Sequence, residues 1–252
     1  MMKKAVVLVL LLVMAMGANA ATITPTPEPD DETMGIDTQE LDFVLEAAEG
    51  QEIDPPITLE LPDDWLSANS TVAIQDVFGL QLVPFTVYAG PVTGGEGFII
   101  VLWGYESTGT FNPITQESNV SPYLDALRLF RLAIIGGDCV PGVDVQQEFS
   151  VGDEVGIGAN FSAYRCEATL DTRGWFVGLE VDGVNMGIYV YTEPIDVMDG
   201  IAPQELQAIL DSAEFDVDGL RVRLRERAEA IRAEIELTGT PPAPTVTATP
   251  AP

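Results

Sequence analysis

The chain has 252 residues, of which forty are acidic, eleven are basic and none is histidine, so its formal net charge is −29 at pH 7. Nucleic acids and anionic membranes are bound through basic surfaces, and this charge argues against both as partners. Without histidine, and with lysine only at positions 3 and 4, the sequence excludes Ser-His-Asp triads, Schiff-base and Walker lysines, and histidine-ligated metals. The charge is compatible with cations, with basic partners or with a solvated acidic surface.

Residues 1–20 have the pattern of a secretory signal peptide. Lys3 and Lys4 precede an apolar run, and Ala18-Asn19-Ala20 is a small-x-small cleavage pattern. The run is shorter than the ~20 residues of a membrane-spanning helix, and no later segment is as apolar. We therefore expect a secreted or extracytoplasmic chain that starts near Ala21, with no membrane span. It should lack a lipid anchor, because no cysteine stands at the cleavage site. Its charge would be −31, from nine arginines and forty acidic residues.

Composition divides the rest of the chain. Residues 21–35 are rich in Thr, Pro and acid, and residues 238–252 are rich in Thr, Pro and Ala. Such segments bury too little apolar surface to offset the entropy of ordering, so both are predicted to be disordered. Between them we expect one globular domain over 36–216 and an amphipathic helix over 217–237.

Periodicity and turn residues predict an α+β domain. A short helix should begin at Asp37 or Thr38 and end at Gly50, and the segment after Ser121-Pro122 should be a helix with Leu124, Leu127, Leu129 and Ile134 on its apolar side. Pro203 should open a third helix, which ends at 215 and buries Leu206, Ile209, Leu210 and Ala213. Strands are predicted at 57–61, 71–77, 83–89, 97–105, 157–168, 174–182 and 186–193. Asp182-Gly183 should join the last two strands in a tight hairpin. Because hairpins dominate, we expect a twisted, mainly antiparallel sheet covered by helices.

The first of two elements is an early strand leading into Leu61-Pro62-Asp63-Asp64-Trp65. The second is a late hairpin followed by a helix that ends in "ILDSAEF" at 209–215. The order of these two elements resembles the PsbP-like superfamily. The resemblance covers about residues 53–216. It implies an α-β-α sandwich that acts as a non-catalytic accessory or binding domain, in which the Pro-x-x-Trp corner closes the first hairpin and Trp65 packs at the core edge. It transfers no functional residue. The acidic bias, the cysteine pair and the helix after 216 depart from the family.

Cys139 and Cys166 are predicted to form a disulfide, because thiols of exported proteins are normally oxidised. Closing a loop of this length would stabilise the fold by roughly 3–4 kcal/mol on the chain-entropy model. A nucleophilic or metal-binding cysteine would need a histidine or lysine neighbour, which the exported chain lacks.

Oxygen ligands suit calcium, so the acidic residues are candidate calcium ligands. The segment Glu214–Gly219 approaches the opening of an EF-hand loop, but it begins with Glu and has Arg225 at the twelfth position. The weak metal candidates are Asp196, Asp199, Asp216 and Asp218, and the alternative for each is a loop or helix-cap role. No other cofactor is expected.

Paired carboxylates could also serve as the acid and base of a glycosidase. Adjacent acids such as Asp63-Asp64 do not suit this role, because neighbouring residues of a strand point to opposite faces. Asp63, Asp64 and Trp65 could instead form a sugar-binding corner. Since Pro62 ends an alternating strand, we favour a structural turn there.

The helix predicted over 217–237 carries five of the nine arginines and an apolar stripe of Leu220, Leu224, Ala228, Ile231 and Ile235. The stripe could dock on its own domain, pair with a second copy or bind a partner. The sequence as a whole predicts a secreted, non-enzymatic accessory or binding domain. A calcium-dependent cell-surface or envelope protein and a carboxylate-pair glycosidase are the alternatives.

Overall fold

The structure is a computed structural model that describes residues 54–76, 79–107, 110–112, 117–119, 121–135, 139–166 and 170–238. The predicted signal peptide, the predicted disordered segment 21–35, the tail after Thr238 and the helix predicted from Asp37 or Thr38 lie outside these residues. Every helix in the described part of the chain falls short of the length and apolar character that crossing a bilayer requires.

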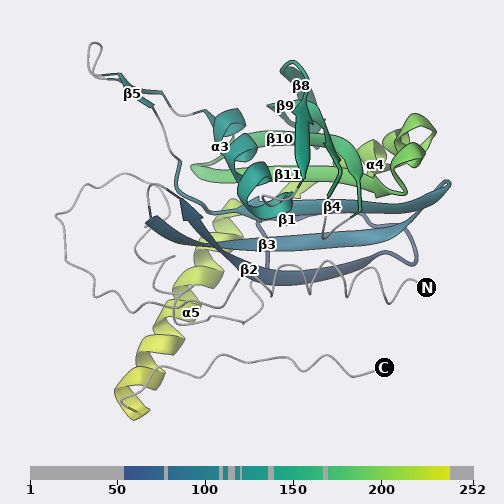
Figure 1. The fold of residues 1–252 in the computed structure, drawn as a ribbon. Helices are drawn as coiled ribbons and strands as arrows, with labels where there is room; N and C mark the ends of the chain where they lie inside the picture. Colours follow the sequence, from purple (N-terminus) through teal and green to yellow (C-terminus); the bar gives the residue numbers. More distant parts are fainter. Residues whose placement is uncertain are drawn as a thin grey trace.

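The main element is an eight-stranded antiparallel sheet with the order β2-β3-β4-β11-β10-β9-β7, in which β8 also pairs with β9 (Figure 1). Its strands are β2 (Leu66–Asp76), β3 (Gly79–Val92), β4 (Gly95–Trp103), β7 (Val140–Val143), β8 (Gln147–Val151), β9 (Glu154–Tyr164), β10 (Thr172–Val181) and β11 (Val184–Glu193). Two small sheets pair β1 (Ile57–Thr58) with β12 (Glu214–Phe215), and β5 (Thr110–Asn112) with β6 (Glu117–Asn119).

The helical elements are α3 (Pro122–Leu129), α4 (Ala202–Asp211) and α5 (Val217–Thr238). A π-helical turn, η1 (Phe130–Ile134), continues α3, and a 3-10 turn, η2 (Ile195–Asp199), follows β11. The Ser121 hydroxyl caps α3 by accepting a hydrogen bond from the Leu124 N–H at 3.4 Å, and Pro122 supplies the fixed φ that suits the first turn.

Helices cover both faces of the sheet, and alternate residues of each central strand enter two different cores. On β4, Ile99, Val101 and Trp103 pack in a core that includes residues of α4 and α5, whereas Phe98, Ile100 and Leu102 pack in a core that includes residues of α3. Figure 1 shows α3 and α5 on opposite sides of the sheet. The predicted antiparallel α+β fold, an α-β-α sandwich, is therefore confirmed, and burial on both faces explains why β10 and β11 are almost continuously apolar.

The predicted hairpin at Asp182-Gly183 is also confirmed. Val181 pairs with Val184, and the two residues between them have φ of 50° and 80°. Positive φ at both central positions is what a two-residue type I′ turn requires, and Asp-Gly adopts it readily.

The prediction of a strand at 57–61 was wrong in extent. Only Ile57–Thr58 is a strand, and it pairs with β12 instead of with the main sheet. Ile57 and Leu59 are nevertheless buried, so the alternation that suggested a strand reflects core packing of an extended segment. Because β1 pairs with β12 and not with β2, the corner at Trp65 does not close a first hairpin, which the family resemblance had implied.

Other boundaries also differ. The third helix ends at Asp211 and not at 215, because Glu214–Phe215 form β12, although its predicted buried residues Leu206, Ile209, Leu210 and Ala213 are all buried. On α3, Leu124 is 48 % exposed, and the buried face is formed by Tyr123, Ala126, Leu129 and Phe130. The sequence did not predict β5–β8.

Candidate functional site

The corner at residues 62–65 is a turn that fixes Trp65 in the fold. The Trp65 N–H donates to the Pro62 carbonyl oxygen at 3.3 Å, and the indole Nε1–H donates to the Pro91 carbonyl oxygen at 3.3 Å. The indole is 8 % exposed and lies against Gly90, where a Cβ atom would be 2.3 Å from Trp65 Cγ. Asp63 and Asp64 are exposed beside it. Since the ring is buried against β3, it offers no open face for stacking on a sugar.

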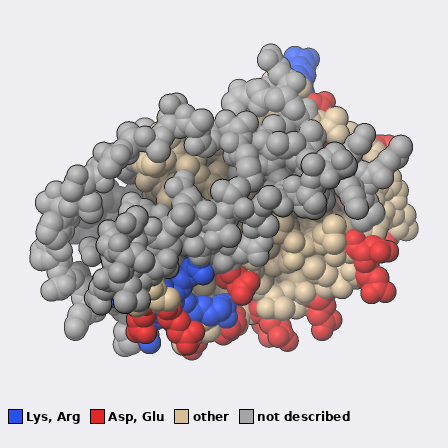
Figure 2. Space-filling model, turned by 90° about the horizontal axis from the view of Figure 1, so that it is seen from below, with Lys and Arg blue, Asp and Glu red and all other residues tan. Residues whose placement is uncertain are grey.

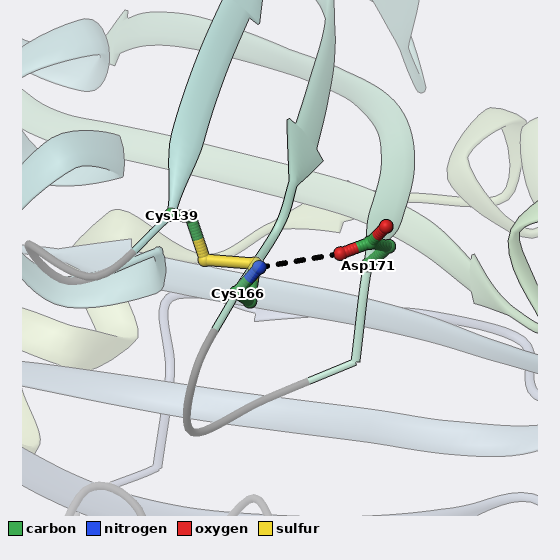
Figure 3. Close-up of a disulfide and its surroundings, with 3 residues drawn as sticks. All are labelled: Cys139, Cys166 and Asp171. Atoms are coloured by element: carbon green, nitrogen blue, oxygen red, sulfur yellow. Dashed lines mark hydrogen bonds between the residues drawn. A yellow bond between two sulfur atoms is a disulfide. The ribbon is translucent and has the colours of Figure 1, made fainter.

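Cys139 and Cys166 are bonded to each other, which confirms the predicted disulfide (Figure 3). The bond joins the residue before β7 to the segment after β9. The Cys166 N–H donates to Asp171 Oδ1 at 3.3 Å, so the segment after β9 is also tied to the start of β10. Both sulfur atoms therefore have a structural role at this end of the sheet.

Three of the four aspartates proposed as calcium ligands have other partners. Asp199 pairs with Arg173 at 2.6 Å, and Asp218 pairs with Arg221 at 2.9 Å. Asp216 precedes α5 and accepts from the Gly219 N–H at 2.9 Å. This hydrogen bond, followed by the pairing with Arg223 at 3.1 Å, holds the pKa of Asp216 below its usual range. Asp196 lies exposed in η2. Among the residues that the structure describes, no three acidic or cysteine side chains are grouped to hold a metal ion.

The first half of α5 packs on the domain. Leu220, Leu224 and Ala228 are buried in the core on the α4 side of the sheet. Arg221 Nη2 donates to the Asp182 carbonyl oxygen at 2.5 Å, and Arg223 Nη2 donates to the Pro55 carbonyl oxygen at 3.4 Å. Residues 217–228 therefore dock on their own domain, as the first of the three alternatives requires.

The later turns of α5 extend beyond the sheet in Figure 1, and the side chains of Ile231 and Ile235 lie outside the described residues. On the face in Figure 2, basic side chains lie beside acidic ones, and further acidic side chains follow the lower border. The part of this face that belongs to described residues is therefore mixed in charge and not uniformly basic.

A buried polar cluster lies between α3 and the segment after β4. Asp125 is 1 % exposed, and its Oδ2 accepts from Ser107 Oγ at 2.6 Å. Arg128 Nε lies 4.0 Å from Asp125 Oδ1, and Tyr189 Oη donates to the Ala126 carbonyl oxygen at 2.8 Å. Burial raises the pKa of Tyr105 and that of Tyr189 well above the ordinary value, so both phenols stay protonated. The cluster holds α3 against the sheet.

A second pair of acids was not predicted from the sequence. Glu96 on β4 and Glu193 on β11 are direct cross-strand partners, although they are 97 positions apart. Burial, followed by repulsion from Glu96, raises the pKa of Glu193. Two neighbouring carboxylates are the feature that acid-base catalysis in glycosidases uses. Only the pairing of β4 with β11 brings them together, and no local motif marks it.

The two edges of the sheet differ in how they are protected. At one edge, β7 and β8 both pair with β9, but residues 144–146 stand opposite only residues 159 and 160, which is a β-bulge. This edge also carries Pro141, exposed Glu148 and the disulfide. Bulges, prolines and charges are the usual means of preventing another strand from pairing with an edge.

At the other edge, β2 has no bulge and no proline, and its one charged residue, Asp76, is its last. It pairs with β3 over eleven consecutive residues in one constant register, from Leu66 opposite Ala89 to Asp76 opposite Gly79. Residues 66–75, "LSANSTVAIQ", contain no proline and no charged residue. Within the described ranges, β2 ends the strand order, so no further strand covers its outer side.

The register indicates which β2 residues point their backbone groups outward. Thr71 stands opposite Pro84, which has no N–H to donate, so this is a non-hydrogen-bonded pair. Hydrogen-bonded and non-hydrogen-bonded pairs alternate, so Ser67, Asn69, Thr71 and Ala73 direct N–H and C=O away from β3. Their side chains are exposed or half-buried, and among the described residues the outward groups form an open ladder.

Neither a protein-family model nor a curated protein matches this chain.

Proposed function

We propose that this protein is an exported, non-enzymatic binding domain that recognises protein by adding a strand to the outer edge of β2. The observation that carries the proposal is the contrast between the two edges of the sheet. The edge formed by β7 and β8 has a bulge, a proline and a charge, whereas the β2 edge has an uninterrupted register and no charge from Leu66 to Gln75.

Strand addition fits the chemistry of this edge. An extended peptide would exchange hydrogen bonds with the outward groups of Ser67, Asn69, Thr71 and Ala73. Each such bond contributes about 0.5–1.5 kcal/mol net, so a ladder of several gives a useful affinity. Leu66 is 54 % exposed at one end of the edge and would provide an apolar contact for a side chain of the bound strand.

The remaining parts of the proposal come from the sequence. The signal-peptide pattern of residues 1–20 supports export, and the absence of histidine and of lysine after residue 4 supports a non-enzymatic role. The resemblance to the PsbP-like superfamily supports an accessory or binding domain.

Panning a displayed library of random peptides of about twelve residues on residues 21–252 tests the proposed function. Bound peptides should be extended and rich in β-branched residues. Their binding should be lost in Thr71→Pro, which removes an outward N–H, and kept in Thr71→Val, which retains it. Peptides that bind both variants equally, or a failure to enrich any peptide on protein that is monomeric, would contradict recognition at this edge.

The Glu96–Glu193 pair favours a second candidate function, that of a carboxylate-pair glycosidase. Activity on fluorogenic glycosides should then be present in the unmodified protein and lost in both Glu96→Gln and Glu193→Gln. Equal activity in the unmodified protein and the two variants would assign that activity to another source.

A further inference from the structure

We infer that the strand received by the outer edge of β2 is β2 of a second copy of this chain, an inference that rests on the proposed function. The two copies would pair antiparallel about a two-fold axis perpendicular to the sheet, so that their sheets form one continuous sheet. Such an interface is self-complementary, because each copy contributes the same edge.

Charge selects the second copy over a basic partner. About one residue in six of the chain is acidic, yet residues 66–75 contain no acid. A basic partner would be bound best where acids line the edge, whereas a copy with the same negative charge can approach closely only where they are missing. The described acid that contacts this part of β2 is Asp54, whose Oδ1 accepts from Asn69 Nδ2 at 3.5 Å on one face of the strand.

The pattern of side chains favours a register with the two-fold axis at Ser70. In this register Leu66 lies opposite Ile74 of the other copy, and Ala68 lies opposite Val72. All four residues lie on the face of β2 that is turned towards α3, where Val72 and Ile74 are buried in the core. The exposed Leu66 of one copy would therefore extend the apolar core of the other copy across the axis. Asp76 stays outside the paired stretch.

The same register uses the outward backbone groups. Ser67 comes opposite Ala73 of the other copy and Asn69 comes opposite Thr71, each as a hydrogen-bonded pair. The two strands would exchange about eight hydrogen bonds, two for each such pair. Ser70 meets its own symmetry mate as a non-hydrogen-bonded pair, with Cα atoms ~4.5 Å apart.

The net charge makes a distinctive prediction for salt. Two copies of about −31 repel each other beyond the uncharged edge, and salt screens this repulsion within a Debye length of ~10 Å at 0.1 M. The dimer should therefore strengthen when the salt concentration rises from ~20 mM to ~500 mM. A complex with a basic protein would weaken over the same range.

Sedimentation velocity of residues 21–252, over a series of concentrations at low and high salt, measures this association. The unmodified chain should form a dimer that high salt favours. Ser70→Glu places two like charges opposite each other and should raise the dimer dissociation constant at least ~10-fold, which corresponds to ~1.4 kcal/mol. Ser70→Gln, of nearly the same size, should leave it within a few fold. Thr71→Pro should be monomeric and Thr71→Val dimeric, and far-UV circular dichroism checks that each variant is folded.

Introduced cysteines test the register. Ser70→Cys should form a covalent dimer under mild oxidation, because the two residues meet across the axis within disulfide range. Ser67→Cys should not, because its symmetry mate lies at the other end of the paired stretch. Cross-linking of Ser67→Cys alone would overturn the register.

A monomer at every concentration and salt level, or a dimer that none of the edge variants weakens, would overturn the inference. The proposed function can be judged separately. If the chain is monomeric but peptides bind it and lose binding in Thr71→Pro, strand addition stands with another protein as the partner. If both assays fail, the β2 edge is not a binding surface.

Discussion

Replacing Gly90 by alanine should destabilise the domain through one contact, that with the indole of Trp65. A Cβ atom at Gly90 would lie 2.3, 2.4 and 2.6 Å from three atoms of the ring, where ordinary contacts between carbon atoms are about 3.5–4.0 Å. The ring has little freedom to move away, because its far end is 3.4 Å from a Cβ built on Gly97 of the neighbouring strand and its Nε1–H donates to the Pro91 carbonyl oxygen.

The size of the effect follows from two limits. Overpacking that the surroundings can absorb costs about 1–3 kcal/mol. Complete expulsion of the ring would approach the cost of deleting a buried tryptophan, about 3–5 kcal/mol. We expect a loss of about 3 kcal/mol for Gly90→Ala. In a domain of this size that loss lowers the melting temperature by roughly 6–12 °C.

A double-mutant cycle with Trp65→Ala, measured by urea unfolding, identifies the contact responsible. Once the ring is absent, Gly90→Ala should cost less than about 1 kcal/mol, which gives a coupling of about 2 kcal/mol. Val145→Ala is the control, because that side chain is 84 % exposed, and it should change stability by no more than about 0.5 kcal/mol. Additive effects of Gly90→Ala and Trp65→Ala would show that the indole is not fixed against Gly90. The corner at residues 62–65 would then again be a candidate ligand-binding surface.

Three further predictions concern other contacts. Glu193→Gln should raise stability by about 0.5 kcal/mol at neutral pH, because it removes a like-charge pair that water partly screens. A group whose pKa is raised in the folded protein lowers stability as pH rises through that pKa. The stability gained by Glu193→Gln should therefore fade as pH falls towards the usual glutamate pKa. A stability difference between the variant and the unmodified protein that stays constant from pH 8 to 4 would contradict an electrostatic origin. In urea unfolding, Leu220→Ala should lower the free energy of unfolding by about 2–5 kcal/mol, and Val222→Ala, at an exposed position, by less than about 0.5 kcal/mol. Equal losses in the two variants would contradict the docking of α5 on the domain. Cys139→Ser together with Cys166→Ser should cost roughly 3–4 kcal/mol in thermal unfolding, and an unchanged melt would leave the bond without a stabilising role.

The sequence predicts best what depends on neighbouring residues. The hairpin between β10 and β11 follows from two apolar runs on either side of Asp182-Gly183, since the dipeptide itself suits the turn. The disulfide follows from the chemistry of exported thiols and needs no knowledge of the fold. Both predictions rest on information that lies within the element concerned.

Features that depend on distant partners were missed. The pairing of β1 with β12, and that of Glu96 with Glu193, require knowing which strands lie together. The face of α3 was misjudged because Leu124 is apolar yet exposed, whereas Asp125 is buried with Ser107 as its partner. Propensity and periodicity describe which side chains prefer the interior, and a buried hydrogen bond can override that preference.

The edge strands show the same limit. The strands β7 and β8 are short and are separated by a bulge, so the alternation on which strand prediction relies is broken between them. For β2, the uncharged stretch is visible in the sequence, but its position at the end of the sheet is not. An uncharged strand in the centre of a sheet is paired on both sides. At the edge of the sheet, the same strand leaves one side free to pair with another strand.

Amide hydrogen exchange resolved at single residues tests the central claim most directly. In dilute protein the N–H groups of Ser67, Asn69, Thr71 and Ala73 should exchange rapidly, while those of Ala68, Ser70 and Val72, which bond to β3, should be protected. At concentrations where the chain associates, or with a bound peptide, the first set should become protected as well. Protection of that set at every dilution, or its rapid exchange in the associated protein, would contradict recognition by strand addition at β2.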